Sequence, residues 1–188
     1  MHRPTRHGTR RRARGVSLIE LLATTAVLAI LGAMAIPSFE SLVNRNRLAN
    51  ASNEMLAFLG TARLEAVARH ARVDLCRSDD GEHCAADATL TRGWMASRQD
   101  GAERRVIAAT PMRFAVDMQL NQAAGNWRGY GPDGRMRTGG PTASVGRVRL
   151  CIPVARPHDN IRDVTIRASG RVEVIASSGN GACPPPQD

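Results

Sequence analysis

The chain has 188 residues, 43% of them hydrophobic and 3% aromatic, a length that suits one globular domain with an N-terminal segment and excludes two full domains. Its formal net charge is +9, and all 26 basic residues are arginine. Six arginines lie in residues 1–15, which hold no acid, so residues 16–188 carry 20 arginines against 17 carboxylates, or +3, and the high charge is weak evidence for nucleic-acid binding.

Residues 16–36 form an almost wholly apolar run that holds one carboxylate, Glu20. An ordinary secretory signal ending at residues 33–35 (Ala-Met-Ala) is one interpretation, but the run exceeds the usual core of about 7–15 residues and Glu20 interrupts it. A plain transmembrane anchor is a second, because 21 helical residues cover about 30 Å, the hydrocarbon thickness of a bilayer. The basic leader would then stay in the cytoplasm. An anchor alone leaves the intramembrane acid without a partner.

Residues 15–20, Gly-Val-Ser-Leu-Ile-Glu, resemble the processing site of type IV prepilins and type II secretion pseudopilins. The resemblance implies that prepilin peptidase cuts after Gly15 and methylates the new N-terminus at Val16, which stands where the family usually has phenylalanine. Glu20 would become the fifth mature residue. It would compensate the N-terminal amine of its own chain or of a neighbouring subunit, which makes a buried charge tolerable. We therefore expect the segment to anchor the precursor and later to pack within an assembly.

Residues 37–70 are predicted to continue the helix. Pro37 lacks an amide N–H and clashes one turn back, so we expect a kink there. Apolar residues then recur at three- and four-residue spacing, which is typical of an amphipathic helix that packs under a sheet and ends near His70. They are Phe39, Leu42, Val43, Met55, Leu56, Leu59, Ala62, Ala66 and Val67. Unbroken from residue 18 to 70, such a helix would be about 80 Å long.

The stretch at residues 61–76 is similar to the end of the long helix and the first strand of the GspH/FimT pseudopilins and minor pilins. The heads of that family share an Ala-Arg-x-Glu-Ala segment that leads into a strand ending in Cys. The matching residues are Ala62, Arg63, Glu65, Ala66 and Cys76. The resemblance implies an α+β, pilin-like fold, in which a long N-terminal helix, membrane-spanning in its first half, packs on an antiparallel β-sheet head.

Beyond His70 the pattern changes to short alternating segments separated by turn residues, which predicts strands. The expected strands are residues 73–76, 94–97, 106–109, 113–116, 145–152, 164–167 and 171–175. The whole chain is then divided into a basic leader (1–15), the membrane or assembly half of the helix (16–36), its amphipathic half (37–70), a β-rich periplasmic head (71–183) and a disordered, proline-rich tail (184–188).

Four cysteines lie beyond the apolar run: Cys76, Cys84, Cys151 and Cys183. An even number behind an export segment indicates disulfides. Of three pairings we favour Cys76–Cys84, which closes a short loop, together with Cys151–Cys183, which pins the tail. No Cys-x-x-Cys occurs and His83 is the one His beside a Cys, so we expect no metal site. A redox switch is disfavoured because only scattered arginines would activate a thiolate.

No catalytic signature is present: we find no nucleophile elbow, phosphate loop, paired-His helix motif or carboxylate pair. We therefore expect no enzymatic activity and no cofactor. The role that these features favour is that of a minor pilin or pseudopilin in a type IV pilus or type II secretion pseudopilus. Its partners would be prepilin peptidase, other pilins and the inner membrane, with the N-terminus cytoplasmic and the head periplasmic. An exported soluble protein is the remaining alternative.

Arginine placement raises a binding function as an alternative. The strand alternation puts Arg147 and Arg149 on one outward face, and Arg167 and Arg171 would join them if the strands are neighbours. The ordinary interpretation is a solvated sheet face. Some FimT-type minor pilins, however, carry a Gly-Arg-x-Arg motif that contacts double-stranded DNA during natural transformation. Here the motif positions are residues 170–173, Gly-Arg-Val-Glu, and the carboxylate of Glu173 would offset the attraction of Arg171 for phosphate.

Overall fold

The computed structural model describes residues 15–85, 93–111, 117–120, 127–138 and 146–186. The chain divides into two units, residues 1–38 and 39–188. One helix, α1 (Leu18–Ala68), is 51 residues long and contains Pro37, and the boundary between the units falls one residue after that proline. The leader and the expected strand at residues 113–116 lie outside the described residues.

In the first unit, the apolar side chains of α1 are exposed; Leu28 and Ile36, for example, are 67% and 71% exposed. The hydroxyls of Thr24 and Thr25 donate to the carbonyls of Leu21 and Leu22 at 2.9 and 3.0 Å, so these polar groups are satisfied within the helix. Among the described residues, α1 is the one helix long and apolar enough to cross a membrane, by length and composition.

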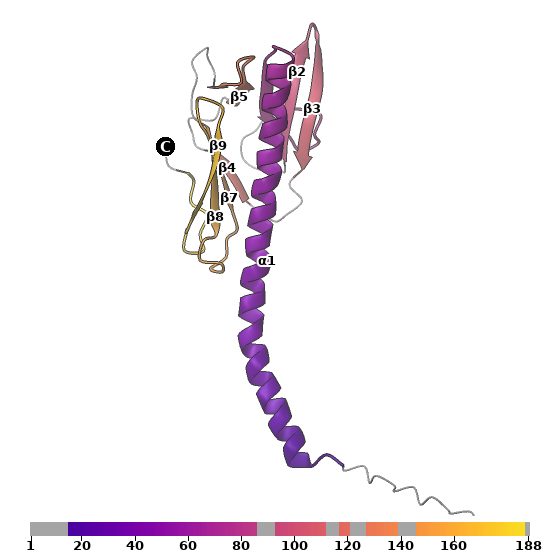
Figure 1. Cartoon of the computed structure of the whole chain (residues 1–188), viewed down its shortest axis with the longest axis vertical. Coiled ribbons are helices and arrows are strands. Elements are labelled where there is room, and N and C mark those ends of the chain that lie inside the picture. The colour runs from indigo at the N-terminus through magenta and orange to yellow at the C-terminus, as the bar shows by residue number, and fades with distance from the viewer. Residues whose placement is uncertain (1–14, 86–92, 112–116, 121–126, 139–145, 187–188) are drawn as a thin grey trace, which may run out of the picture. The chain divides into compact units, whose positions relative to one another are not determined.

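The second unit contains two antiparallel sheets (Figure 1). The five-stranded sheet has the order β3-β2-β1-β5-β6 and the four-stranded sheet the order β4-β7-β8-β9. The strands are β1 (Val73–Arg77), β2 (Gly93–Asp100), β3 (Glu103–Pro111), β4 (Asp117–Leu120), β5 (Trp127–Tyr130), β6 (Met136–Thr138), β7 (Gly146–Cys151), β8 (Ile161–Ile166) and β9 (Val172–Ser177). The prediction of a long helix with an antiparallel β head is confirmed.

Three strands, β4, β5 and β6, were not predicted. Strand β6 has only three residues, too few for an alternating pattern to emerge, and β4 has four. Strand β5 is interrupted by Gly129, which has a positive φ of 98° and lies at a register shift. A Cβ at this glycine would collide with the carbonyl oxygen of Val73 on the neighbouring strand. The close approach of the two backbones requires a glycine there, and that glycine removes the strand signal.

The second half of α1 supplies the core shared by both sheets. Its buried face packs with Trp94 and Tyr130 of the first sheet and with Val148 and Val164 of the second, and Figure 1 shows both sheets alongside this part of the helix. The fully buried helical residues are Leu48, Ala51, Met55, Leu59, Ala62 and Ala66. Phe39, Leu42 and Val67 were predicted to belong to this face but are 68%, 53% and 43% exposed.

The Ala-Arg-x-Glu-Ala segment joins α1 to the sheets through its charged members. Arg63 donates from Nε to the carbonyl of Gly134 at 3.1 Å and from Nη2 to that of Ser169 at 3.3 Å. Glu65 accepts a hydrogen bond of 2.9 Å from Arg98 of β2, whose side chain is only 9% exposed. Arg98 also donates to Asp100 at 2.6 Å. A buried guanidinium is tolerated because it has two carboxylate partners.

The turn between β8 and β9 lies against the turn before β6. Gly170 has a φ of +81°, and a Cβ on it would meet the carbonyl oxygen of Gly134. The same carbonyl accepts from Arg63. The first residue of the Gly-Arg-x-Arg-like segment is thus required by backbone packing between the two turns.

We expect Gly170→Ala to destabilise the head by about 2–4 kcal/mol, because the left-handed backbone and the new steric overlap each cost roughly 1–2 kcal/mol. Gly101→Ala is the matched control: its φ is +62°, but nothing lies within 4 Å of the added Cβ, so it should be destabilised by only about 1–2 kcal/mol. Urea unfolding in detergent, followed by tryptophan fluorescence, measures both. Equal destabilisation would show that the contact with Gly134 contributes nothing.

Candidate functional site

The processing segment lies at the start of α1. Gly15 has no atom within 4 Å of an added Cβ, and Val16 is 73% exposed. Glu20 is exposed and falls in the first turn of the helix, where a carboxylate interacts favourably with the helix dipole. Within the described part of the chain the structure gives Glu20 no ion-pair partner. Among the described residues, the segment is therefore sterically accessible and its acid has no counter-ion.

The first disulfide joins Cys76 to Cys84, as favoured from the sequence, and closes a loop organised by Asp80. One carboxylate oxygen of Asp80 accepts from the amides of Glu82 and His83, both at 2.8 Å. The other lies 2.8 Å from Nδ1 of His83. The two amide hydrogen bonds, followed by the His83 side chain, hold the pKa of Asp80 well below its ordinary value. In turn, the hydrogen bond and negative charge of Asp80 raise the pKa of His83.

The second disulfide joins Cys151 of β7 to Cys183 and holds the tail beside the four-stranded sheet. Fully buried Asn160 supports this arrangement. Its Nδ2 donates to the carbonyls of Ile152 and Ala182 at 3.0 and 3.1 Å, and its Oδ1 accepts from the amide of Gly179 at 2.7 Å. Residues 184–186 of the tail that is expected to be disordered (184–188) follow this segment, and residues 187–188 lie outside the described residues. Arg149 donates to the carbonyls of Pro184 and Pro185 at 3.0 and 3.3 Å.

The outward face of the four-stranded sheet brings the candidate arginines close to acids. The register pairs Arg149 with Asp163 and Arg147 with Thr165, and Thr165 with Glu173. Arg149 makes a bidentate contact with Asp163 at 2.7 and 2.8 Å, and both side chains are nearly buried, at 12% and 13% exposed. The hydrogen bond that Arg149 donates to Asp163 raises the pKa of Arg149, so this arginine is committed to an internal pair.

Arg167 and Arg171 flank the turn that connects β8 to β9. Arg167 donates to Glu173 at 2.7 Å, and this hydrogen bond is the main cause that lowers the pKa of Glu173, with Arg171 adding to it by its charge. Arg171 is exposed. The four arginines thus lie near two carboxylates, and Arg149 and Arg167 are paired with them. The expected patch of arginines is therefore interrupted by Asp163 as well as by Glu173.

Asp163 is the residue of this face that sequence reasoning missed. The strand was predicted to begin at Val164, whereas β8 begins at Ile161. Had the strand been started three residues earlier, the alternation of the strand would have placed Asp163 on the face opposite to buried Val164. Its pairing with Arg149 depends on the cross-strand register, which local pattern does not specify.

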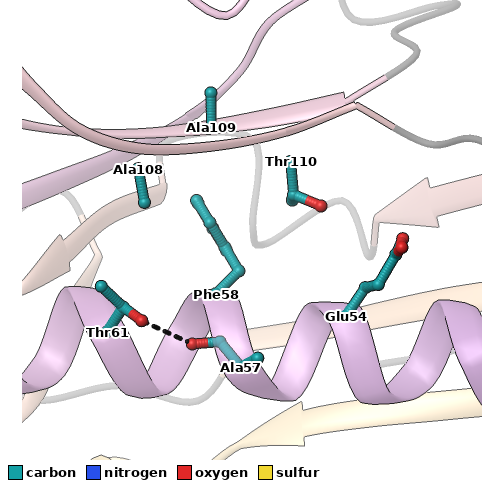
Figure 2. Close-up of a pocket in the computed structure, with 7 residues that line it drawn as sticks. All are labelled: Glu54, Ala57, Phe58, Thr61, Ala108, Ala109 and Thr110. Carbon is teal, nitrogen blue, oxygen red and sulfur yellow. Dashed lines mark hydrogen bonds between the residues drawn. The ribbon is translucent and has the colours of Figure 1, made fainter.

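A shallow pocket of about 330 Å³ lies between α1 and β3. Figure 2 shows Glu54, Phe58 and Thr61 on the helix facing Ala108 and Thr110 on the strand. The Thr61 hydroxyl donates to the carbonyl of Ala57 at 2.9 Å, so it is engaged in the helix. A single carboxylate among alanine, phenylalanine and threonine side chains does not make a catalytic arrangement. In the described part of the chain, no group of three or more His, Cys, Asp or Glu residues that could hold a metal ion is found.

Two protein-family models match the chain. The model described as type II transport protein GspH covers residues 51–170, and the prokaryotic N-terminal methylation motif covers residues 10–36. The structure is similar to the crystal structure of the type IV minor pilin FimU from Pseudomonas aeruginosa, with a TM-score of 0.53, 17% sequence identity, and coverage of 74% of this chain and 98% of that chain. No curated protein sequence matches the chain significantly.

We expect the imidazole of His83 to titrate above its ordinary pKa of 6.5, because Asp80 stabilises the protonated ring. The contribution of this pair to loop stability is fully present below pH 6.5 and disappears as the pH rises through the raised pKa. NMR titration of the ring measures the shift. Asp80→Asn should lower the His83 pKa, whereas Asp79→Asn, which removes a neighbouring charge, should leave most of the shift in place. Equal effects of the two variants would refute the role given to Asp80.

Proposed function

Because the chain belongs to the GspH family of type II transport proteins, we propose that it is a minor pilin or pseudopilin, a structural subunit of a type IV pilus or of a type II secretion pseudopilus. The observation that carries the proposal is the division of α1. Its first half exposes nearly every apolar side chain, while its second half forms the core of the head. An apolar surface of this extent needs cover. The membrane would provide it in the precursor, and neighbouring helices would provide it in the fibre.

Processing of the N-terminus links these two states. Prepilin peptidase would remove residues 1–15 and methylate Val16 on the cytoplasmic side of the inner membrane, with the head in the periplasm. The match to the N-terminal methylation motif supports this order of events. Val16 precedes Glu20 by four residues, about one helical turn, so the new amine would lie within reach of the carboxylate on the same chain or on an adjacent subunit. The resulting pair would offset the cost of burying either charge among apolar helices.

DNA capture during natural transformation is the second candidate function. It is favoured by the exposed guanidinium of Arg171 beside the backbone turn at Gly170. It is opposed by the pairing of Arg149 with Asp163 and of Arg167 with Glu173. Any such binding would be directed to the phosphate backbone and would weaken steeply with salt. We therefore place this candidate below the structural role.

The processing proposal predicts one intact mass for the protein isolated from its host membrane or fibre. The mass should correspond to residues 16–188 with one added methyl group and two disulfides. Gly15→Val should block cleavage, because the peptidase is expected to require the small residue before the cut, and should leave the unmethylated full-length chain. Intact-protein mass spectrometry decides the matter. A wild-type protein that starts at Met1 or at Ile36 would contradict the proposal.

The DNA candidate predicts that Glu173→Ala binds double-stranded DNA more tightly than wild type, because the substitution frees Arg167 from its carboxylate partner. Arg171→Ala should bind more weakly. Removal of one arginine–phosphate interaction should also make the dependence of affinity on salt less steep by about one unit of the log–log slope. Fluorescence anisotropy at several salt concentrations measures both changes. If neither substitution alters affinity, the sheet face is not a DNA-binding surface.

A further inference from the structure

A cluster of four arginines lies where the start of the packed helix meets the loop before β8. We call Arg45, Arg47, Arg156 and Arg162 the basic cluster. Asn44 of α1 joins its parts: its Nδ2 donates to the carbonyl of Arg156 at 3.0 Å, and its Oδ1 lies 3.5 Å from Nη1 of Arg47. Arg162 lies close enough to Arg45 to be affected by its charge. Segments more than 100 residues apart thus bring these arginine residues near one another.

The cluster differs from the sheet face in that its cations are not paired with acids. Arg45, Arg47 and Arg156 are exposed, and among the described residues none of them has a carboxylate partner within ion-pair distance. Arg162 is half-buried and fixed by hydrogen bonds to the carbonyls of Asp159 and Ile161 at 2.9 and 2.8 Å. Burial lowers the pKa of Arg162, the negative charge of Asp159 partly offsets this by raising it, and the positive charge of Arg45 lowers it further. The acids in these segments are Glu40, which is exposed, and Asp159, which contacts His158 at 3.2 Å.

The basic cluster is also close in sequence to the apolar run. Nine residues separate Ile36 from Arg45, and a chain of that length spans at most about 32 Å when fully extended. A membrane that holds the apolar run therefore keeps the cluster within a short tether of its surface, whatever the orientation of the head. Attraction to surface phosphates acts over the Debye length of about 8 Å, and the tether allows the arginines to come within that range.

We propose that the basic cluster binds the anionic phospholipid headgroups of the membrane in which the apolar run is inserted. The inference rests on the proposed membrane-anchored precursor and adds a second contact, made by the head, to that anchor. Guanidinium groups suit this role because each presents several N–H donors to phosphate oxygens. A docked head would stay close to the membrane until the subunit is taken into a fibre, and extraction would have to break these contacts.

Reconstituting the full processed chain in nanodiscs tests the proposal. The four native cysteines are paired and none is free, so a fluorophore attached through Ala155→Cys labels the loop beside the cluster selectively. Its quenching by spin-labelled headgroups reports docking of the head. We expect strong quenching in membranes that contain phosphatidylglycerol, weak quenching in phosphatidylcholine alone, and disappearance of the difference at high salt.

Arg45→Gln/Arg47→Gln should lower the ratio of docked to undocked heads by about fivefold for each arginine replaced. Arg104→Gln/Arg105→Gln is the matched control, because it removes the same charge from the start of β3. The start of β3 lies beside Asp100, and Arg69 is close enough to Asp100 to lower its pKa. Because Arg69 lies about 36 Å along the helix from Arg45, the control arginines are far from the basic cluster. The control should dock as wild type does.

Quenching that is equal in the two lipid mixtures, or that both double variants reduce alike, overturns the proposal. If quenching depends on the number of chains per nanodisc and not on lipid charge, the proposal is also overturned. The basic cluster would then be a contact surface between subunits. A chain that does not co-migrate with lipid at all refutes the membrane anchor itself, so failure of the proposed function is distinguished from failure of this inference.

Discussion

The packing of one face of α1 against both sheets is the contact on which the head depends. Residues from Leu48 to Ala66 supply the fully buried side of the helix, and each sheet contributes its own apolar face to the same cluster. Neither sheet could bury that face without the helix. Three alanines on the helix, Ala51, Ala62 and Ala66, are fully buried, and their small side chains let the strands approach closely. The head is therefore organised around the helix that also carries the apolar run.

Charged residues at the C-terminal end of this face fix how the helix meets the strands. Arg63 binds carbonyls from two different turns, while Glu65 receives the buried Arg98 of β2. Apolar packing is non-directional. Hydrogen bonds to backbone carbonyls are directional, and so are the contacts of a guanidinium group, which can donate two parallel hydrogen bonds to one carboxylate. The Ala-Arg-x-Glu-Ala segment thus combines both kinds of contact: its alanines allow the helix to approach, and its charges set the position of the turns around it.

Much of the fold could be predicted because it rests on local pattern. The long helix follows from an apolar run joined to an amphipathic one, and strands β1, β2, β3, β7, β8 and β9 follow from alternation, with ends shifted by at most three residues. The strands that were not predicted are short or contain Gly129, where the close approach to the backbone of Val73 leaves no room for a side chain. Phe39 and Leu42 have helical spacing yet stay exposed, because periodicity identifies a face of the helix but not the length over which that face is covered.

The arginines show where sequence pattern stops being informative about a surface. Arg149 and Arg167 have the same chemistry as Arg45 and Arg156, but cross-strand register and a tight turn bring acids against the first two, whereas the described residues give the second two no carboxylate partner. Because long-range pairing decides which guanidinium groups are neutralised, a count of arginines per strand overestimates the charge of the sheet face. Arg45, Arg47 and Arg156, which have no carboxylate partner among the described residues, lie on α1 and on the loop before β8. On the sheet face, Arg171 is exposed beside the pair formed by Arg167 and Glu173. The basic cluster is thus less offset by carboxylates than Arg149 and Arg167 are, which supports contact of the cluster with lipid phosphates over contact of the sheet face with nucleic acid.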